Sequence, residues 1–121
     1  MRQLPVVLTI ALPLFAGDLQ AQGIRDLSPE QRAELTVFGL NVGLALRISP
    51  KALQAELSDD DLGGLVATAL EILALRCARV TGVEAVDTPG RYRVTCSSEP
   101  RSEQSHVYMV DALRGAAAKA R

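Results

Sequence analysis

Few side chains in this sequence are of types that perform acid–base, nucleophilic or metal chemistry, and they lie far apart. The only histidine is His106, and the only cysteines are Cys77 and Cys96. The cysteine spacing matches neither a redox pair nor a zinc site. One histidine, without a free thiol or a serine–histidine–aspartate set, leaves little for nucleophilic catalysis. We therefore expect no enzyme, and no catalytic, cofactor-binding or metal-binding residue.

Two acidic features of the sequence fit helix structure better than a cation site. Three aspartates at 59–61 follow Ser58, a residue type that caps helices, and the first turn of a helix favours negative charge. No further carboxylates follow at the spacing of a calcium loop. Glu71 is the single charge in a long apolar run. We expect it on an exposed helix edge; if it were buried, Arg76 or Arg47 would be its partner.

The beginning of the chain predicts a secretory signal peptide at residues 1–21. A positively charged start precedes an apolar run from Leu4 to Ala16, and polar residues follow. A run of about 13 residues is shorter than the 18 or more of a spanning helix. We expect cleavage after Ala21, with Ala16 as the alternative site, which leaves one exported domain at 22–121. The pattern is typical of bacterial periplasmic or secreted proteins; a buried helix or a retained anchor is the alternative.

Export predicts a structural role for the two cysteines. In an oxidising compartment a pair of cysteines usually forms one disulfide, so we expect a Cys77–Cys96 bridge. Such a bridge should stabilise the fold by about 3 kcal/mol, mainly by restricting the unfolded chain. Two buried free thiols are the alternative.

Composition excludes some partners. The chain has 121 residues, enough for one domain, and a formal net charge of -1, so no excess charge points to nucleic acid or an anionic membrane. Hydrophobic residues make up 48% of the chain but aromatic residues only 3%. Base stacking on aromatic side chains, the usual basis of single-strand binding, is therefore not expected.

A first helix is expected over residues 29–47. Ser28 is the predicted cap, Pro29 suits the first helical position, and Gln31 completes a capping box. Gly39 and Gly43 then lie four residues apart. In a membrane this spacing lets helices pair closely, and in other proteins it marks tight contact with a neighbouring element, which we favour. A strand over the same residues is the alternative.

Two more helices are expected before the pattern changes. The Ser49–Pro50 pair predicts a short helix over 50–57. A long helix over 59–80 should follow the cap at Ser58. Because it is apolar nearly all round, we expect the first helix to cover one side of it and a sheet the other.

Alternating apolar residues then predict strands. A strand at 83–87, a turn ending at Gly90 and a strand at 91–96 form a hairpin, which would place Cys96 opposite Val83. A third strand is expected at 106–111. Residues 116–121 form either a fourth short strand or a helical tail. The expected fold is α+β, with two to three N-terminal helices packed on a small three-stranded antiparallel meander and one disulfide.

The C-terminal half, residues 59–121, resembles the PepSY repeat. That family places a helix before a meander whose last strand reads Tyr-x-Val-Asp-x-x-x-Gly, and Tyr108, Val110, Asp111 and Gly115 match this motif. The resemblance implies an exported or membrane-linked module that inhibits or regulates peptidases or other partners. The disulfide and the long N-terminal helix depart from the family pattern.

Three functions remain open from the sequence. The first is a protein-binding or regulatory module, with a partner face formed by Arg91, Arg93, Thr95 and His106 on the sheet, or by an edge strand. The second is a carrier of a small apolar ligand between the helices and the sheet. The third is a membrane-associated structural protein, without a spanning segment after signal removal, that forms a homodimer through the two spaced glycines.

Overall fold

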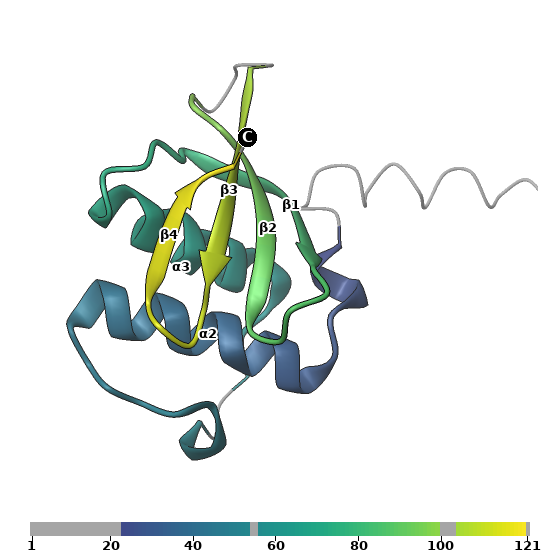
Figure 1. Ribbon diagram of the computed structural model, residues 1–121, viewed down its shortest axis with the longest axis vertical. Coiled ribbons are helices and arrows are strands. Elements are labelled where there is room, and N and C mark those ends of the chain that lie inside the picture. Colours follow the sequence, from purple (N-terminus) through teal and green to yellow (C-terminus); the bar gives the residue numbers. More distant parts are fainter. Residues whose placement is uncertain (1–22, 54–55, 100–103, 121) are drawn as a thin grey trace, which may run out of the picture.

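The computed structural model describes residues 23–53, 56–99 and 104–120, which form two layers (Figure 1). The predicted signal peptide lies outside these residues. Helices α2 (Pro29–Leu44) and α3 (Asp59–Ile72) lie on one face of a four-stranded antiparallel sheet. The α+β class is as predicted, but the sheet has four strands rather than three, because the C-terminal segment forms the fourth strand rather than a helical tail.

Helix α2 begins where its sequence predicts. Ser28 Oγ accepts a hydrogen bond from the Gln31 amide (3.1 Å), and Gln31 Oε1 accepts one from the Ser28 amide (2.9 Å), so the capping box is complete. Pro29 occupies the first helical position. The helix ends at Leu44, before the predicted end at residue 47, because Ala45 adopts a left-handed conformation with φ of 55°.

The segment between the helices contains less helix than predicted. Where the predicted helix over 50–57 should begin, a 3-10 turn spans Pro50–Ala52 and Leu53 is extended. Residues 54–55 of that prediction lie outside the described residues. Ser49 makes no side-chain capping bond, so the turn lacks the interaction that would stabilise a longer helix. The prediction of this short helix is wrong.

Helix α3 starts as predicted and ends early. Ser58 Oγ accepts a hydrogen bond from the Asp61 amide (3.2 Å), and the three aspartates occupy the first turn. The helix ends at Ile72 rather than at residue 80, because Ala74 is left-handed (φ 67°) and the amides of residues 73–75 bond back to the last turn. Because the sequence is largely apolar up to Leu75, with Glu71 as the only charge after the aspartates, it carries no periodic sign of such an end.

The two helices touch most closely at Gly39. A Cβ on this buried glycine would lie 2.3 Å from Leu65 Cγ of α3, so only glycine fits without repacking. At Gly43, a Cβ would meet Ile72 of α3 at 4.0 Å. The spaced glycines therefore serve contact within the chain, as favoured from the sequence, and Gly39 is covered by its own protein.

A nearly buried cation, Arg32, fixes the direction of the helices. Its guanidinium donates to Asp59 Oδ1 (2.7 Å) and to the carbonyls of Ile24 (3.2 Å) and Leu57 (2.7 Å). The Arg32 side chain is 12% exposed, so these bonds compensate for lost hydration. Because Arg32 and Asp59 both lie near the starts of their helices, α2 and α3 run in the same direction and end at the same side of the molecule (Figure 1).

The sheet is a meander in which each strand pairs with the next along the chain. It consists of β1 (Arg79–Ala85), β2 (Arg91–Ser97), β3 (Ser105–Asp111) and β4 (Ala116–Lys119). The turn between β1 and β2 ends at Gly90 in the left-handed region, with φ of 81°, as its sequence predicts. The prediction placed the first strand at 83–87, too late in the chain.

A β-bulge explains the error in β1. Val83 pairs with Val94, and Val80 pairs with Cys96, with a register shift between Val80 and Gly82. The predicted pairing of Cys96 with Val83 is therefore wrong. Because the bulge adds a residue, Val80 and Val83 are both buried although they lie three apart. A prediction that requires buried residues at every second position therefore misses the pair of Val80 and Val83.

The core lies between the layers. Tyr92, Val94 and Cys96 of β2 are all buried on the face that the sequence predicts. Phe38 of α2 and Leu70 of α3 belong to the same buried cluster. Helix α3 contacts both α2 and β1, as expected for a helix that is apolar nearly all round.

The Cys77–Cys96 disulfide is present, with its Cα atoms 5.1 Å apart and both residues buried. Cys77 lies in the loop after α3 rather than on a helix end. Glu71 is exposed, as expected, but its Oε2 accepts a hydrogen bond from the Cys77 amide (2.6 Å) instead of meeting Arg76 or Arg47. The carbonyl of Arg76 accepts a hydrogen bond from a tyrosine of β3 (2.7 Å). The bridge and these two hydrogen bonds therefore hold the loop at Arg76 and Cys77.

Replacing both Cys77 and Cys96 by Ala should lower the free energy of unfolding by about 3 kcal/mol, since the bridge closes a loop with a sequence separation of 19. Urea unfolding of the oxidised protein and the variant measures this difference. Reductant should destabilise the wild type and leave the variant unchanged. A loss below about 1 kcal/mol would show that the two hydrogen bonds of the loop, at Arg76 and Cys77, suffice without the bridge.

Tyr92 links the core of the sheet to α2. The side chain is buried, and its hydroxyl donates a hydrogen bond to Glu34 Oε1 (2.5 Å). Burial raises the pKa of Tyr92 far above its ordinary value of 10.0, and the hydrogen bond and charge of Glu34 and the charge of Glu30 raise it further. The folded protein therefore holds this phenol neutral at pH values where the unfolded chain would ionise it.

The raised pKa of Tyr92 predicts a loss of stability in alkali. The contribution is complete below the unfolded pKa of 10.0 and decreases as the pH rises above it, because only the unfolded chain then releases the proton. Urea unfolding between neutral pH and pH 11 should show this decline, and Tyr92→Phe should flatten it. Burial also raises the pKa of Tyr108, so some decline should persist in the variant. An identical profile for both proteins would contradict the assignment.

Candidate functional site

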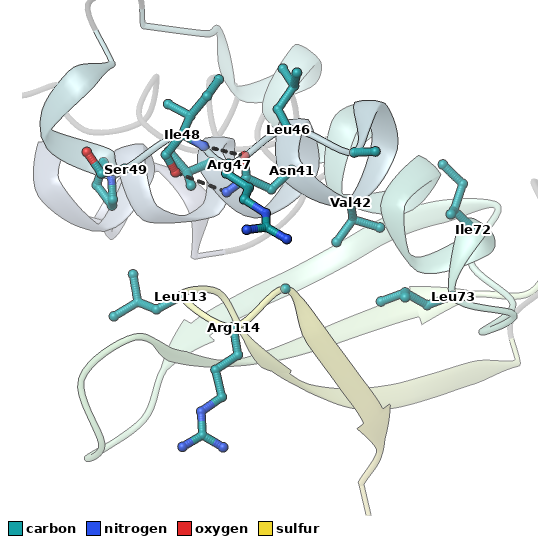
Figure 2. Close-up of a pocket in the computed structure, with 14 residues that line it drawn as sticks. Asn41, Val42, Leu46, Arg47, Ile48, Ser49, Ile72, Leu73, Leu113 and Arg114 are labelled. Carbon is teal, nitrogen blue, oxygen red and sulfur yellow. Dashed lines mark hydrogen bonds between the residues drawn. The ribbon is translucent and has the colours of Figure 1, made fainter.

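The described residues form a groove of about 670 Å³ that several apolar side chains line. Its walls are the loop after α2, the C-terminal end of α3 and the turn between β3 and β4 (Figure 2). We call this depression the end groove. Because the two helices end at the same side of the molecule, their last apolar residues meet here beside the β3–β4 turn.

Exposed apolar side chains gather at the end groove. Among the described residues, the large hydrophobic side chains that are exposed are Leu44 (64%), Leu46 (42%), Ile72 (54%) and Leu113 (56%). Leu46, Ile72 and Leu113 line the groove, and Leu44 ends the helix next to it. Single exposed leucines need no explanation, but a cluster from three separate elements is the kind of apolar patch at which proteins often bind partners.

The loop wall of the end groove is held in place by one asparagine. Ala45 turns the chain back after α2, and Asn41 then bonds the backbone of Ile48 in both directions (Figure 2). Asn41 Nδ2 donates to the Ile48 carbonyl (3.0 Å), and the Ile48 amide donates to Asn41 Oδ1 (2.8 Å). The Asn41 side chain thus satisfies the amide and the carbonyl of Ile48, as a neighbouring strand would, and holds residues 45–50 against α2.

The opposite wall is the β3–β4 turn. Asp111 Oδ1 accepts a hydrogen bond from the Arg114 amide (3.3 Å), and Gly115 has a left-handed φ of 67°. A Cβ on Gly115 would lie 3.6 Å from Val42 of α2, so this turn contacts the helix directly. The position of Leu113 at the rim therefore follows from the turn.

The charged residues that line the end groove are both arginines, Arg47 and Arg114. Arg114 forms a long ion pair with Asp111 (3.8 Å) and is 80% exposed. Within the described part of the chain, Arg47 has no carboxylate partner, and its guanidinium reaches from the loop toward the β3–β4 turn (Figure 2). The groove is therefore apolar with a cationic rim, which suits an apolar occupant that carries a negative charge.

Three residues of the predicted partner face lie together on the other side of the sheet. Arg91, Arg93 and Thr95 alternate with the buried residues of β2, so they occupy the face without helices. Both arginines are already paired: Arg93 lies 2.5 Å from Glu84, and Arg91 lies 3.8 Å from Asp111. Each of these arginines therefore has a carboxylate neighbour, and Arg91 shares its neighbour, Asp111, with Arg114.

His106 does not belong to that face. It pairs directly with Cys96, whose side chain points to the core, so His106 lies on the helix-covered side near the disulfide. Its ring stacks on that of Tyr108, with centroids 6.3 Å apart. The grouping of His106 with Arg91 and Arg93 was an error of register, because the polar loop before β3 hides where the alternation begins.

Among the described residues, no group of three or more His, Cys, Asp or Glu side chains is arranged to hold a metal ion. Asp59, from the acidic run, pairs with Arg32 instead. Across residues 23–53, 56–99 and 104–120, no helix is both long and apolar enough to cross a membrane.

The sequence did not reveal the end groove. Its residues come from three segments that are distant in the chain, and none forms a motif. The available signal was the apolar run that continues past α2 through Leu46 and Ile48, which the helix prediction absorbed into its last turn.

Replacing Asn41 by Ala should release the loop wall. We expect the free energy of unfolding to fall by about 1–2 kcal/mol, since two backbone groups of Ile48 lose their partner. Hydrogen exchange by NMR should show a faster Ile48 amide. Asn41→Asp, which keeps the acceptor for that amide, is the matched control. Equal Ile48 protection in the Ala variant and the wild type would contradict this role.

No protein-family model, curated protein or solved structure matches the chain. The PepSY resemblance therefore rests on its own residues, which have structural roles here. Tyr108 donates a hydrogen bond to the Arg76 carbonyl, Asp111 caps the following turn, and Gly115 adopts the left-handed conformation that the turn requires. These roles belong to a helix-on-meander shape, so membership of the family remains a prediction.

Proposed function

We propose that this protein is a non-enzymatic exported binding module, with a regulatory or inhibitory role, that holds an apolar segment of a protein partner in the end groove. The single observation that carries the proposal is the clustering of the exposed large apolar residues around one groove whose charged residues are both arginines. The PepSY resemblance supports the same class of function.

The size of the end groove suits an anchoring site. A volume of about 670 Å³ lies in the range of ligand pockets and would hold a few apolar side chains of a partner. Protein interfaces draw most of their affinity from such buried anchors, and the surrounding contacts add complementarity. The open sheet face is less suited, because its arginines are already paired within the face.

A carrier of a small apolar ligand is the second candidate. The volume and apolar lining of the end groove favour it, although the site lies at the end of the helices rather than between helices and sheet. The space between the layers is filled by large side chains such as Phe38, Tyr92 and Tyr108. Dimerisation through Gly39 is not proposed, because Leu65 of the same chain occupies that contact.

Site-specific photo-crosslinking tests the proposed function. A photoreactive amino acid at Leu113 or Leu46 should capture one discrete protein in the exported fraction of the source cells. The same group at Thr95, on the open sheet face, is the matched control and should capture none. Ile72→Asp, which places a charge on an already exposed groove residue, should abolish capture without unfolding the protein.

Two outcomes would overturn the proposed function. Capture at Thr95 but not at Leu113 would move the partner to the sheet face. A small molecule that co-purifies with the protein in native mass spectrometry, and is lost in Ile72→Asp, would instead establish the carrier function.

A further inference from the structure

Building on the proposed function, we propose that the partner segment is an extended, acidic peptide that adds to the outer edge of β4 as a fifth strand. Alternate apolar side chains of this peptide would cover the exposed ends of α2 and α3, and a carboxylate would meet Arg47. Strand addition of this kind uses backbone hydrogen bonds for affinity and side-chain pockets for specificity.

The two edges of the sheet differ in their protection. The β1 edge is interrupted by a bulge between Val80 and Gly82, and Gly23 lies so close that its Cβ, if present, would be 1.9 Å from the Val83 carbonyl oxygen. Bulges and covering segments are ordinary ways to block an edge. Strand β4 pairs with β3 without a register shift and contains no proline. Strand β4 is short and ends at Lys119, but among the described residues neither a bulge nor a covering segment closes its edge.

The register shows which backbone groups of β4 are available. The Ala120 amide bonds the Val107 carbonyl (2.9 Å), which makes these two residues a hydrogen-bonded antiparallel pair. Because such pairs alternate along a ladder, Ala118 bonds to β3, whereas the amides and carbonyls of Ala117 and Lys119 point away from it. They present donors and acceptors at the spacing that an added strand requires.

The helices extend beyond the sheet on the β4 side. Figure 1 shows that the C-terminal ends of α2 and α3 pass beyond β4. Leu44 and Ile72, the last residues of these helices, are more than half exposed. A strand added to β4 would lie about 4.8 Å from it, over these ends. The side chain of Ala117 points to the same covered side, so alternate residues of the added strand would do so too.

Charge distinguishes an acidic partner from a second copy of this chain. Arg47 and Arg114 line the groove at the start of β4, and Lys119 lies at the end of the strand. Two copies paired through β4 would bring these cations close together across a two-fold axis, which opposes association. A segment with Asp or Glu would instead pair with Arg47, which lacks a carboxylate partner in the described structure.

Selection from a displayed library of random peptides tests the chemistry of the occupant. Against the wild-type protein we expect binders that alternate apolar residues with others and are enriched in Asp and Glu. Selection of basic peptides, of peptides with helical spacing, or of none would overturn the inference. Dimers in sedimentation velocity, with Ala117 and Lys119 amides protected in the absence of peptide, would assign the edge to a second copy and also overturn it.

Proline substitution at the two edges tests strand addition with a selected peptide. Ala117→Pro removes an amide that points away from β3, so the hydrogen bonds between β3 and β4 remain. Ala85→Pro is the matched change on β1: the residues on either side of Ala85 bond to β2, so the Ala85 amide points away from the sheet. We expect about tenfold weaker binding for Ala117→Pro and no change for Ala85→Pro. If the Ala117→Pro variant does not fold, the same test can be made on the peptide. A peptide with the same side chains, but N-methylated on the amides that face β4, should bind the wild-type protein about tenfold more weakly than the unmethylated peptide.

Two further variants separate this inference from the proposed function. Arg47→Ala should lower the affinity for the acidic peptide about tenfold. It should not change the affinity for a peptide in which Gln replaces each acidic residue. Leu113→Asp should abolish binding if the groove is the site at all. If Leu113→Asp abolishes peptide binding but Ala117→Pro leaves it unchanged, strand addition is overturned and the groove is retained as the binding site. Unchanged binding in Leu113→Asp would overturn both.

Discussion

The contact between α2 and α3 at Gly39 sets the arrangement on which the remaining structure depends. A Cβ at this position would overlap Leu65, so the close approach of the helices requires a residue without a side chain. Arg32 adds a directional constraint, because its guanidinium joins the start of α2 to the start of α3. Two helices that run in the same direction must finish at the same side, and the intervening segment must return along the outside.

The end groove is a consequence of that parallel arrangement. The helices finish beyond β4 (Figure 1). Leu44 and Ile72 at their ends are exposed, and no strand of the described residues covers them. The loop after α2 could still have covered them, but Asn41 holds it at Ile48 as a wall. A sheet that is narrower than the helix layer thus leaves apolar surface next to an edge strand, a combination that natural proteins usually avoid unless a partner covers it.

Electrostatics distinguish the two faces that could bind a partner. On the open sheet face, Arg91 and Arg93 already have carboxylate partners across neighbouring strands. These pairs are exposed, so they add little stability, but they offset part of the positive charge of the face. Arg47 lies instead among apolar neighbours without such a partner in the described structure. A cation without a carboxylate partner beside an apolar groove favours an occupant that carries a negative charge.

Local features could be predicted from the sequence because their causes lie within a few residues. The helix caps at Ser28 and Ser58, the turn at Gly90 and the buried face of β2 all follow from neighbouring residues. The disulfide followed from the cysteine count and the predicted export. Helix ends, strand register and the fourth strand were misjudged or left open, because left-handed alanines and a β-bulge leave no periodic mark.

The end groove depended on tertiary structure alone. Leu46, Ile72 and Leu113 are ordinary leucines and isoleucines in the chain, and they become a site only because parallel helices and a narrow sheet bring them together. Conversely, Arg91, Arg93 and His106 suggested a single surface in the sequence, but the pairing of His106 with Cys96 places it on the opposite face. Local chemistry determines which elements form, whereas the packing of distant elements determines which of their residues remain exposed together.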